Sequence, residues 1–301
     1  MTISHSNELY RHLLTITGHS GAIYSIQYDG SFIYSASADK FVTRWNFLTG
    51  KQDNFAIKLE NIPYAILVLN NSNNIIIGTN NGKMHIIDLI GKQEIKCFEQ
   101  HQSGIFYLLN HPVKNRFYSS DASGNIGVWC SKTWKLEVFI PLNCGKIRRI
   151  VLDENENKLF VAGQDGYVYI LDTEFYNLIN KFYGHEQGIS SIMICEDEKI
   201  LFTGGKDALL KQWDLTSFSL LKSIPAHNFV LYDIVNIGLE NFATISRDKS
   251  IKIWQYNPLH ILLKIDSKNK GHQHSVNGLI KIDKNHFATC SDDKSIRVFG
   301  K

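Results

Sequence analysis

The sequence predicts an all-β protein in which similar units stack around one centre, and two observations carry that prediction. One motif recurs along nearly the whole chain: a short strand, a polar turn and a hydrophobic strand ending in Trp or another large apolar residue. The end residues are spaced by 42, 42, 42, 42, 41 and 45 residues: Trp45, Ile87, Trp129, Leu171, Trp213, Trp254 and Phe299. A period near 42 is typical of four-stranded blades. We therefore expect a seven-bladed β-propeller that forms one domain over residues 1–301.

The first strand of a blade begins with an apolar residue, and in five blades this residue comes four positions after a His. The pairs are His19 and Ile23, His101 and Ile105, His185 and Ile189, His227 and Leu231, and His272 and Val276. Apolar residues at the ends of each run, with small or polar residues between them, suit a central strand packed against its neighbours.

Polar turns and a second strand follow. The turns are predicted at Asp29–Gly30 and at 70–74, 153–157 and 196–198, where Asn, Asp, Gly or Glu predominate. Asn, Asp and Gly tolerate the backbone angles of tight hairpins. The second strand is β-branched and aromatic in all seven repeats, as in FIYSAS and NIIIGT, and the third strand ends at the Trp-like residue. The outer strand is less regular.

The two ends of the chain complement each other. Leu9 to Thr17 resembles an outer strand with no blade before it, and the last repeat ends at Phe299 with no outer strand after it. We expect residues 1–17 to supply the outer strand of blade 7, which would close the ring and remove free strand edges.

These repeats resemble the WD40-repeat family over roughly Leu9 to Gly300. Trp213-Asp214 matches the family's Trp-Asp ending, and Gly-His pairs occur at Gly18, Gly184 and Gly271. The resemblance implies a structural hydrogen-bond network of His, Ser or Thr, turn Asp and Trp. By position its members are His19, Ser35, Asp39 and Trp45; His185, Thr203, Asp207 and Trp213; His227, Thr244, Asp248 and Trp254; and His272, Thr289 and Asp293.

The other repeats depart from this pattern. In blade 7, Phe299 replaces Trp and has no indole N–H to donate. Blade 3 has His101 and Trp129, but Ser123 falls in the register of the turn Asp and Asp121 comes two residues early. Blade 2 has no His and carries Asn81 at the position of the turn Asp and Ile87 at the position of the Trp. Blade 4 keeps Asp165 but carries Leu171 at the position of the Trp and Asn143 at the position of the His. We expect packing to hold blades 2 and 4 more than polar networks do.

Composition narrows the class of protein. The chain is 44% hydrophobic, which suits a globular protein, and its net charge of +3 is too small to indicate a general nucleic-acid binder. Its five cysteines are an odd number without a CxxC pair, which favours a reducing compartment. No signal peptide or 20-residue apolar span is visible, so we expect a cytoplasmic protein.

The sequence pattern does not favour a hydrolase triad, a metal site or a P-loop. A His, a Ser or Thr and an Asp together resemble a hydrolase triad, but the set recurs in several blades, whereas an enzyme needs one active site. Buried polar groups that fix turns explain the repetition better. The His272-x-His274 pair suits the start of a metal site, but no further ligand completes it, and no P-loop occurs. We predict no catalytic residue, no metal and no cofactor.

What remains is the surface of the ring. In the family, partners commonly engage one rim near the central channel, and by position seven residues point there: Tyr24, Phe106, Arg148, Lys206, Tyr232, Arg247 and Asp292. Aromatic residues and Arg are enriched at interface hot spots, although aromatics also fill inner strands. Lys268 and Lys270 add to this rim, and the opposite rim collects Asp153, Glu154, Glu156, Glu196, Asp197 and Glu198.

The leading hypothesis is a non-enzymatic scaffold that binds a peptide or protein segment, acidic or phosphorylated, at the mouth of the channel. One alternative is a subunit of a larger complex that uses the blade sides or the acidic rim. Others are a propeller hydrolase, which would need a non-repeating cluster at the channel, and a nucleic-acid-binding module with a steep salt dependence. The fold does not choose between these functions.

Overall fold

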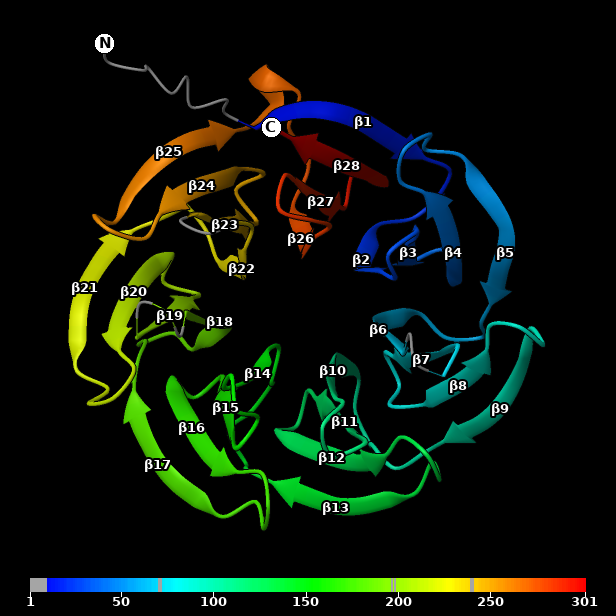
Figure 1. Cartoon of the computed structure of the whole chain (residues 1–301), viewed down its shortest axis with the longest axis horizontal. Helices are drawn as coiled ribbons and strands as arrows, with labels where there is room; N and C mark the ends of the chain where they lie inside the picture. The colour runs from blue at the N-terminus through cyan, green and yellow to red at the C-terminus, as the bar shows by residue number, and fades with distance from the viewer. Residues whose placement is uncertain (1–9, 70–71, 196, 198, 239–240) are drawn as a thin grey trace.

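The computed structural model describes residues 10–69, 72–195, 197, 199–238 and 241–301, which form a ring of seven four-stranded antiparallel sheets (Figure 1). The predicted seven-bladed propeller is confirmed. In blades 1 to 6 the strands run in chain order from the channel to the outside, because each hairpin places the next strand beside the last.

Blades 1 to 3 contain the strands up to Pro141. Blade 1 consists of β2 (Ile23–Tyr28), β3 (Phe32–Ser37), β4 (Phe41–Asn46) and β5 (Gln52–Lys58). Blade 2 consists of β6 (Pro63–Leu69), β7 (Asn74–Thr79), β8 (Met84–Asp88) and β9 (Gln93–Phe98). Blade 3 consists of β10 (Ile105–His111), β11 (Arg116–Asp121), β12 (Asn125–Cys130) and β13 (Leu136–Pro141).

Blades 4 to 6 repeat this arrangement. Blade 4 consists of β14 (Ile150–Leu152), β15 (Lys158–Ala162), β16 (Tyr167–Asp172) and β17 (Leu178–Tyr183). Blade 5 consists of β18 (Ile189–Cys195), β19 (Ile200–Gly205), β20 (Leu209–Asp214) and β21 (Leu220–Pro225). Blade 6 consists of β22 (Leu231–Asn236), β23 (Asn241–Ser246), β24 (Ile251–Gln255) and β25 (His260–Ile265).

Blade 7 joins the two ends of the chain. It contains β26 (Val276–Lys281), β27 (His286–Ser291) and β28 (Ser295–Gly300), and its outer strand is β1 (Arg11–Thr17), which pairs antiparallel with β28. The predicted closure by the N-terminal strand is confirmed, while Leu9, where that strand was expected to begin, lies outside the described residues. A short 3-10 helix, η1 (Ser267–Asn269), lies in the longer connection before blade 7.

The hydrophobic core is divided among the contacts between neighbouring blades. One cluster, for example, joins Phe202 of blade 5 to Phe242 and Trp254 of blade 6, and another joins Ile16 of β1 to Ile23 and Trp45 of blade 1. Since each sheet buries its faces only against the next sheet, an isolated blade would leave its apolar faces in water, and the ring stabilises all of them together.

The turn between the second and third strands places one residue in the left-handed backbone region in every blade. The seven residues have φ between 64° and 92°: Lys40, Gly82, Gly124, Gly166, Ala208, Lys249 and Lys294. At Gly166 the glycine is also required by space, because a Cβ atom there would lie 2.2 Å from the carbonyl oxygen of His185. The glycine of the turn dipeptide Asp165-Gly166 therefore allows the loop at His185 to pass close to the turn.

Candidate functional site at the channel mouth

In six blades the second residue of the innermost strand lines one end of the central channel, and in blade 4 Arg148, two residues before β14, takes this place. Except in blade 4, the pairing of the first two strands shifts register at this residue, as it does between Ile23 and Ser25 around Tyr24. A β-bulge of this kind redirects a side chain out of the ladder. The residues of this layer are Tyr24, Tyr64, Phe106, Arg148, Ser190, Tyr232 and Asn277, and all of them line cavities at the mouth.

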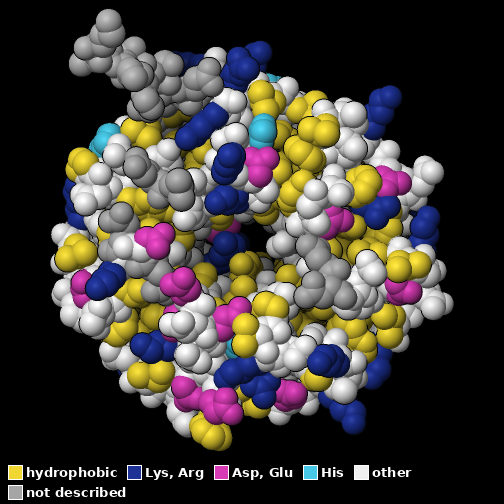
Figure 2. Space-filling model, in the orientation of Figure 1, with side chains coloured by type: hydrophobic (Ala, Val, Ile, Leu, Met, Phe, Trp, Pro, Cys, Tyr) yellow, Lys and Arg dark blue, Asp and Glu magenta, His cyan; other side chains and the backbone are white. Residues whose placement is uncertain are grey.

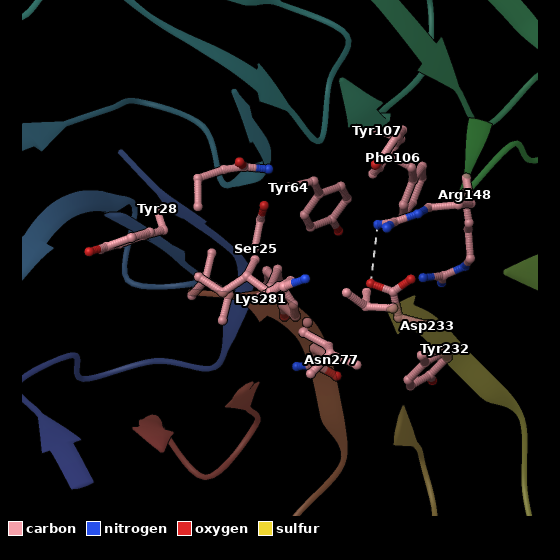
Figure 3. Close-up of a pocket in the computed structure, with 18 of the residues that line it drawn as sticks. Ser25, Tyr28, Tyr64, Phe106, Tyr107, Arg148, Tyr232, Asp233, Asn277 and Lys281 are labelled. Carbon is pink, nitrogen blue, oxygen red and sulfur yellow. Dashed lines mark hydrogen bonds and ion pairs between the residues drawn. The ribbon is translucent and has the colours of Figure 1, made fainter. Parts of the chain in front are cut away.

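Four aromatic rings and one guanidinium of this layer contact one another in sequence. Tyr24 packs edge-on against Tyr64, with 5.3 Å between ring centroids, and Tyr64 lies 5.1 Å from Phe106. The guanidinium carbon of Arg148 lies 5.0 Å from the Phe106 centroid and 5.3 Å from that of Tyr232 (Figure 3). Blade 5 contributes only the small Ser190 to the layer, so Arg148 of blade 4 reaches the ring of blade 6. The contacts hold a cation between two aromatic faces.

Two adjoining cavities meet at Arg148. The larger has a volume of about 570 Å³ and contains the aromatic rings, and the smaller, of about 420 Å³, adds Lys206 and Arg247. Among the described residues, no hydrogen bond or ion pair engages the side-chain cations of Arg148, Lys206 or Arg247. Within the part of the chain that the structure describes, these three cations have no direct counter-ion, and they surround one concave site that Asp207, paired with His185, also lines.

The electrostatics of the mouth reflect this excess of positive charge. Desolvation lowers the pKa of Lys146, and the neighbouring charges of Arg148 and Lys206 lower it further. Burial also lowers the pKa of the Arg148 guanidinium. Both effects disfavour the cationic forms, and an anion bound in the cavity would relieve them.

The acidic groups at the mouth already have partners. Asp233, labelled in Figure 3, lies 3.1 Å from the guanidinium of Arg149, an ion pair between blades 4 and 6. Asp292 accepts a hydrogen bond of 2.7 Å from Asn277. Desolvation raises the pKa of Asp233 to about 6 even beside Arg149. Among the described residues, these carboxylates therefore leave Arg148, Lys206 and Arg247 without a direct ion pair.

The structure brings the predicted mouth residues together. Tyr24, Phe106, Arg148, Tyr232 and Asp292 line the larger cavity, and Lys206 and Arg247 line the smaller one with Arg148 and Tyr232. Sequence reasoning missed other lining residues: Tyr64, Lys146, Arg149, Asp233 and Asn277. For Tyr64 a signal existed, since it lies 42 residues before Phe106, at the repeat period.

Polar networks fix the loops behind the mouth. In blade 1 the Nδ1 of His19 lies 2.8 Å from Asp39, its Nε2 lies 2.8 Å from Ser35, and the indole of Trp45 donates to the same hydroxyl at 2.7 Å. The same contacts link His185, Asp207, Thr203 and Trp213, and His227, Asp248, Thr244 and Trp254; in blade 7, His272 contacts Asp293 and Thr289 without an indole.

Blade 3 carries the same network, which the register of Ser123 did not indicate. The buried Asp121 lies at the end of β11, and its carboxylate is 2.8 Å from the Nδ1 of His101. Ser119 contacts the other ring nitrogen and accepts from the Trp129 indole. Asp121 also accepts hydrogen bonds from the backbone N–H groups of Ser123 and Asn125. A carboxylate two residues before the expected position of the turn Asp therefore still orders the turn.

These networks are repeated and buried. Five blades hold a His between a carboxylate and a hydroxyl, and all five histidines are under 9% exposed. In the His272-x-His274 pair, both ring nitrogens of His272 are already occupied, whereas His274 is exposed. The arrangement orders loops and offers no open ligand set at His272.

Two of the acidic residues predicted for the opposite rim accept backbone hydrogen bonds. Asp153 accepts from Lys158 within its own turn, and Glu156 of blade 4 accepts from Val113 of blade 3. Glu196 and Glu198 lie outside the described residues. Acidic and basic side chains are interspersed around the channel opening on the face that Figure 2 shows. Within the described residues, no helix is long and apolar enough to cross a membrane.

A comparison with known protein families supports the repeats found in the sequence. The family model described as WD domain, G-beta repeat matches residues 10–46, 176–214 and 264–300, which are parts of blades 7 and 1, of blades 4 and 5, and of blades 6 and 7. The chain belongs to the WD40-repeat family. Its three matched segments include the polar networks of His19, His185 and His272.

The relatives of this WD40 protein are distant and have varied names. It is 22% identical over 84% of its length to the human kinesin-like protein KIF21A, of which it covers 14%. It is 21% identical over 88% of its length to the striatin homolog of Dictyostelium discoideum, of which it covers 32%. It is also 40% identical over 27% of its length to the pre-mRNA-splicing factor PRP46 of Candida albicans, of which it covers 22%. The chain thus spans only part of these proteins.

Proposed function

We propose that this WD40 propeller is a non-enzymatic interaction scaffold that binds an anionic segment of a partner protein, acidic or phosphorylated, at the mouth of its channel. The observation that carries the proposal is Arg148, whose guanidinium lies between Phe106 and Tyr232, lines both cavities and has no anionic partner among the described residues. A phosphate or carboxylate group is the complement that its planar donors favour.

Each of the two cavities suits a different part of the bound segment. Lys206 and Arg247 join Arg148 around the smaller cavity, which suits the anionic group. Tyr24, Tyr64 and Phe106 form an apolar wall in the larger cavity, which suits neighbouring side chains of the same segment. Rigid aromatic rings beside an Arg are the residue types that dominate binding energy at interfaces.

The names of the relatives support a scaffold in general terms and do not select a partner. They include a kinesin-like protein, a striatin homolog and a pre-mRNA-splicing factor. Because one fold hosts unrelated functions, the side chains at the mouth, and not the fold, indicate the class of partner. Docking of a complex through the blade sides or the acidic rim is the rival proposal. None of the five cysteines, all of them among the described residues, forms a disulfide, which fits a reducing compartment; a cytoplasmic location stays a prediction.

A peptide array tests this proposal. Matched peptides would carry phosphoserine, phosphothreonine, glutamate or serine at one central position, with random flanking residues. The wild type is compared with a variant carrying Arg148→Gln, Lys206→Gln and Arg247→Gln. The control variant carries the same number of charge losses at exposed sites outside the mouth, Lys92→Gln, Lys132→Gln and Lys135→Gln.

We expect the wild type and the control to prefer phosphorylated or acidic peptides and the mouth variant to lose that preference. Equal binding of neutral peptides, or retention of binding by the mouth variant, would move the interface to another surface. Tight binding of a single-stranded oligonucleotide without peptide selectivity would instead favour the nucleic-acid alternative.

A further inference from the structure

A second cluster of reactive side chains lies on the outer edge of blade 2, away from the mouth. His85 of β8 and Glu94 and Cys97 of β9 place one potential ligand atom each within 4.8 Å of one another. The Nδ1 atom of His85 lies 2.9 Å from Glu94 Oε1. No other group of three such residues meets this condition in the part of the chain that the structure describes.

The pairing of the two strands brings these residues together. His85 is directly opposite Cys97 in the antiparallel ladder, and a register irregularity between Ile86 and Ile87 places Glu94 opposite Ile87. The His85 side chain is only 14% exposed, so its ring is held by its surroundings, whereas the Glu94 side chain is 46% exposed and Cys97 is exposed. One fixed and two adjustable ligands therefore face the same point in solvent.

We propose that His85, Glu94 and Cys97 form a three-ligand site for Zn²⁺, with water in the fourth position. An imidazole, a carboxylate and a thiolate are the groups that zinc binds, and three protein ligands with an open position form a known class of zinc site. The thiolate and the carboxylate together supply two negative charges, which balance the charge of the ion. Lys83, a cation whose charge acts on Cys97, is itself paired with Glu99 at 2.7 Å.

The movements needed to bind zinc are small. Tetrahedral coordination at ordinary bond lengths separates ligand atoms by about 3.3–3.6 Å. The distance of 2.9 Å between His85 and Glu94 would increase slightly. The sulfur of the exposed Cys97, which lies within 4.8 Å of the other two ligand atoms, would move toward them by about 1 Å. Side-chain rotation at exposed positions supplies such shifts without a change in the strands.

Titration of the purified full chain with Zn²⁺ and Co²⁺ tests the site. Zinc affinity is measured by competition with a chromophoric chelator, and Co²⁺ reports a thiolate ligand through its charge-transfer absorption. The variants are Cys97→Ser and His85→Gln, and Cys130→Ser is the matched control because Cys130 is a partly exposed cysteine outside the cluster. Circular dichroism verifies that each variant is folded.

We expect one Zn²⁺ per chain, a Co²⁺–thiolate band, and an affinity at least about tenfold weaker in Cys97→Ser and His85→Gln but unchanged in Cys130→Ser. Zinc should also protect Cys97 from alkylation and leave Cys130 reactive. A folded Cys97→Ser protein that binds zinc as tightly as the wild type would overturn the proposal. So would the absence of a thiolate band at stoichiometric Co²⁺.

Discussion

Closure of the ring by β1 makes a specific prediction about Ile16. Its side chain is 1% exposed and packs with Ile23, Trp45 and Val298 at the junction of blades 7 and 1, whereas Leu13 on the same strand is 44% exposed. Replacing a buried Ile by Ala costs about 2–5 kcal/mol, because apolar contacts are lost and a cavity remains. Replacing an exposed apolar residue usually costs less than about 0.5 kcal/mol.

Thermal unfolding distinguishes the two substitutions. For a chain of this size each kcal/mol lowers Tm by roughly 2 °C, so Ile16→Ala should lower Tm by about 4–10 °C. Leu13→Ala should change it by about 1 °C or less. Circular dichroism at several heating rates gives both values. Equal Tm for Ile16→Ala and the wild type would refute the closure of blade 7 by the N-terminal strand.

Two further predictions concern blade 3. Asp121→Ala removes the buried partner of His101 and should destabilise the protein by about 3–5 kcal/mol in denaturant titrations, whereas Ser123→Ala should cost less than about 1 kcal/mol; the reverse order would contradict the network at Asp121. Desolvation lowers the pKa of His111 from 6.5 to about 4, so the unfolded chain binds more protons between these values and stability must fall as pH drops from 6.5 to 4, by up to about 3 kcal/mol for this group. A His111→Gln variant should show a shallower pH dependence of its unfolding free energy, and an unchanged slope would assign the effect to other groups.

The repeat made the fold predictable. A fixed period and recurrent Trp-like endings set the blade number and boundaries, and the two unmatched ends of the chain indicated how the ring closes. Each of these signals is local or periodic in the sequence, and each reports a backbone arrangement that all seven blades share.

The contents of the mouth were predictable only in part. Counting from the His of each blade located Tyr24 and Tyr232, but blade 2 has no His to set the count, and Tyr64 was missed. The ion pair of Arg149 and Asp233 joins residues 84 positions apart across the ring, and no local pattern encodes it. Such contacts depend on side-chain reach and on which blades contribute small residues.

The measurement that tests the central claim most directly is the affinity of one phosphorylated or acidic peptide, chosen from the array, for the wild type and for Arg148→Gln. Fluorescence anisotropy at two salt concentrations gives Kd for both proteins. A hydrogen bond to a charged group contributes about 1.5–3 kcal/mol, so the variant should bind roughly ten to a hundred times more weakly and with a smaller salt dependence. Equal Kd and equal salt dependence for the two proteins would contradict an anion site at the mouth.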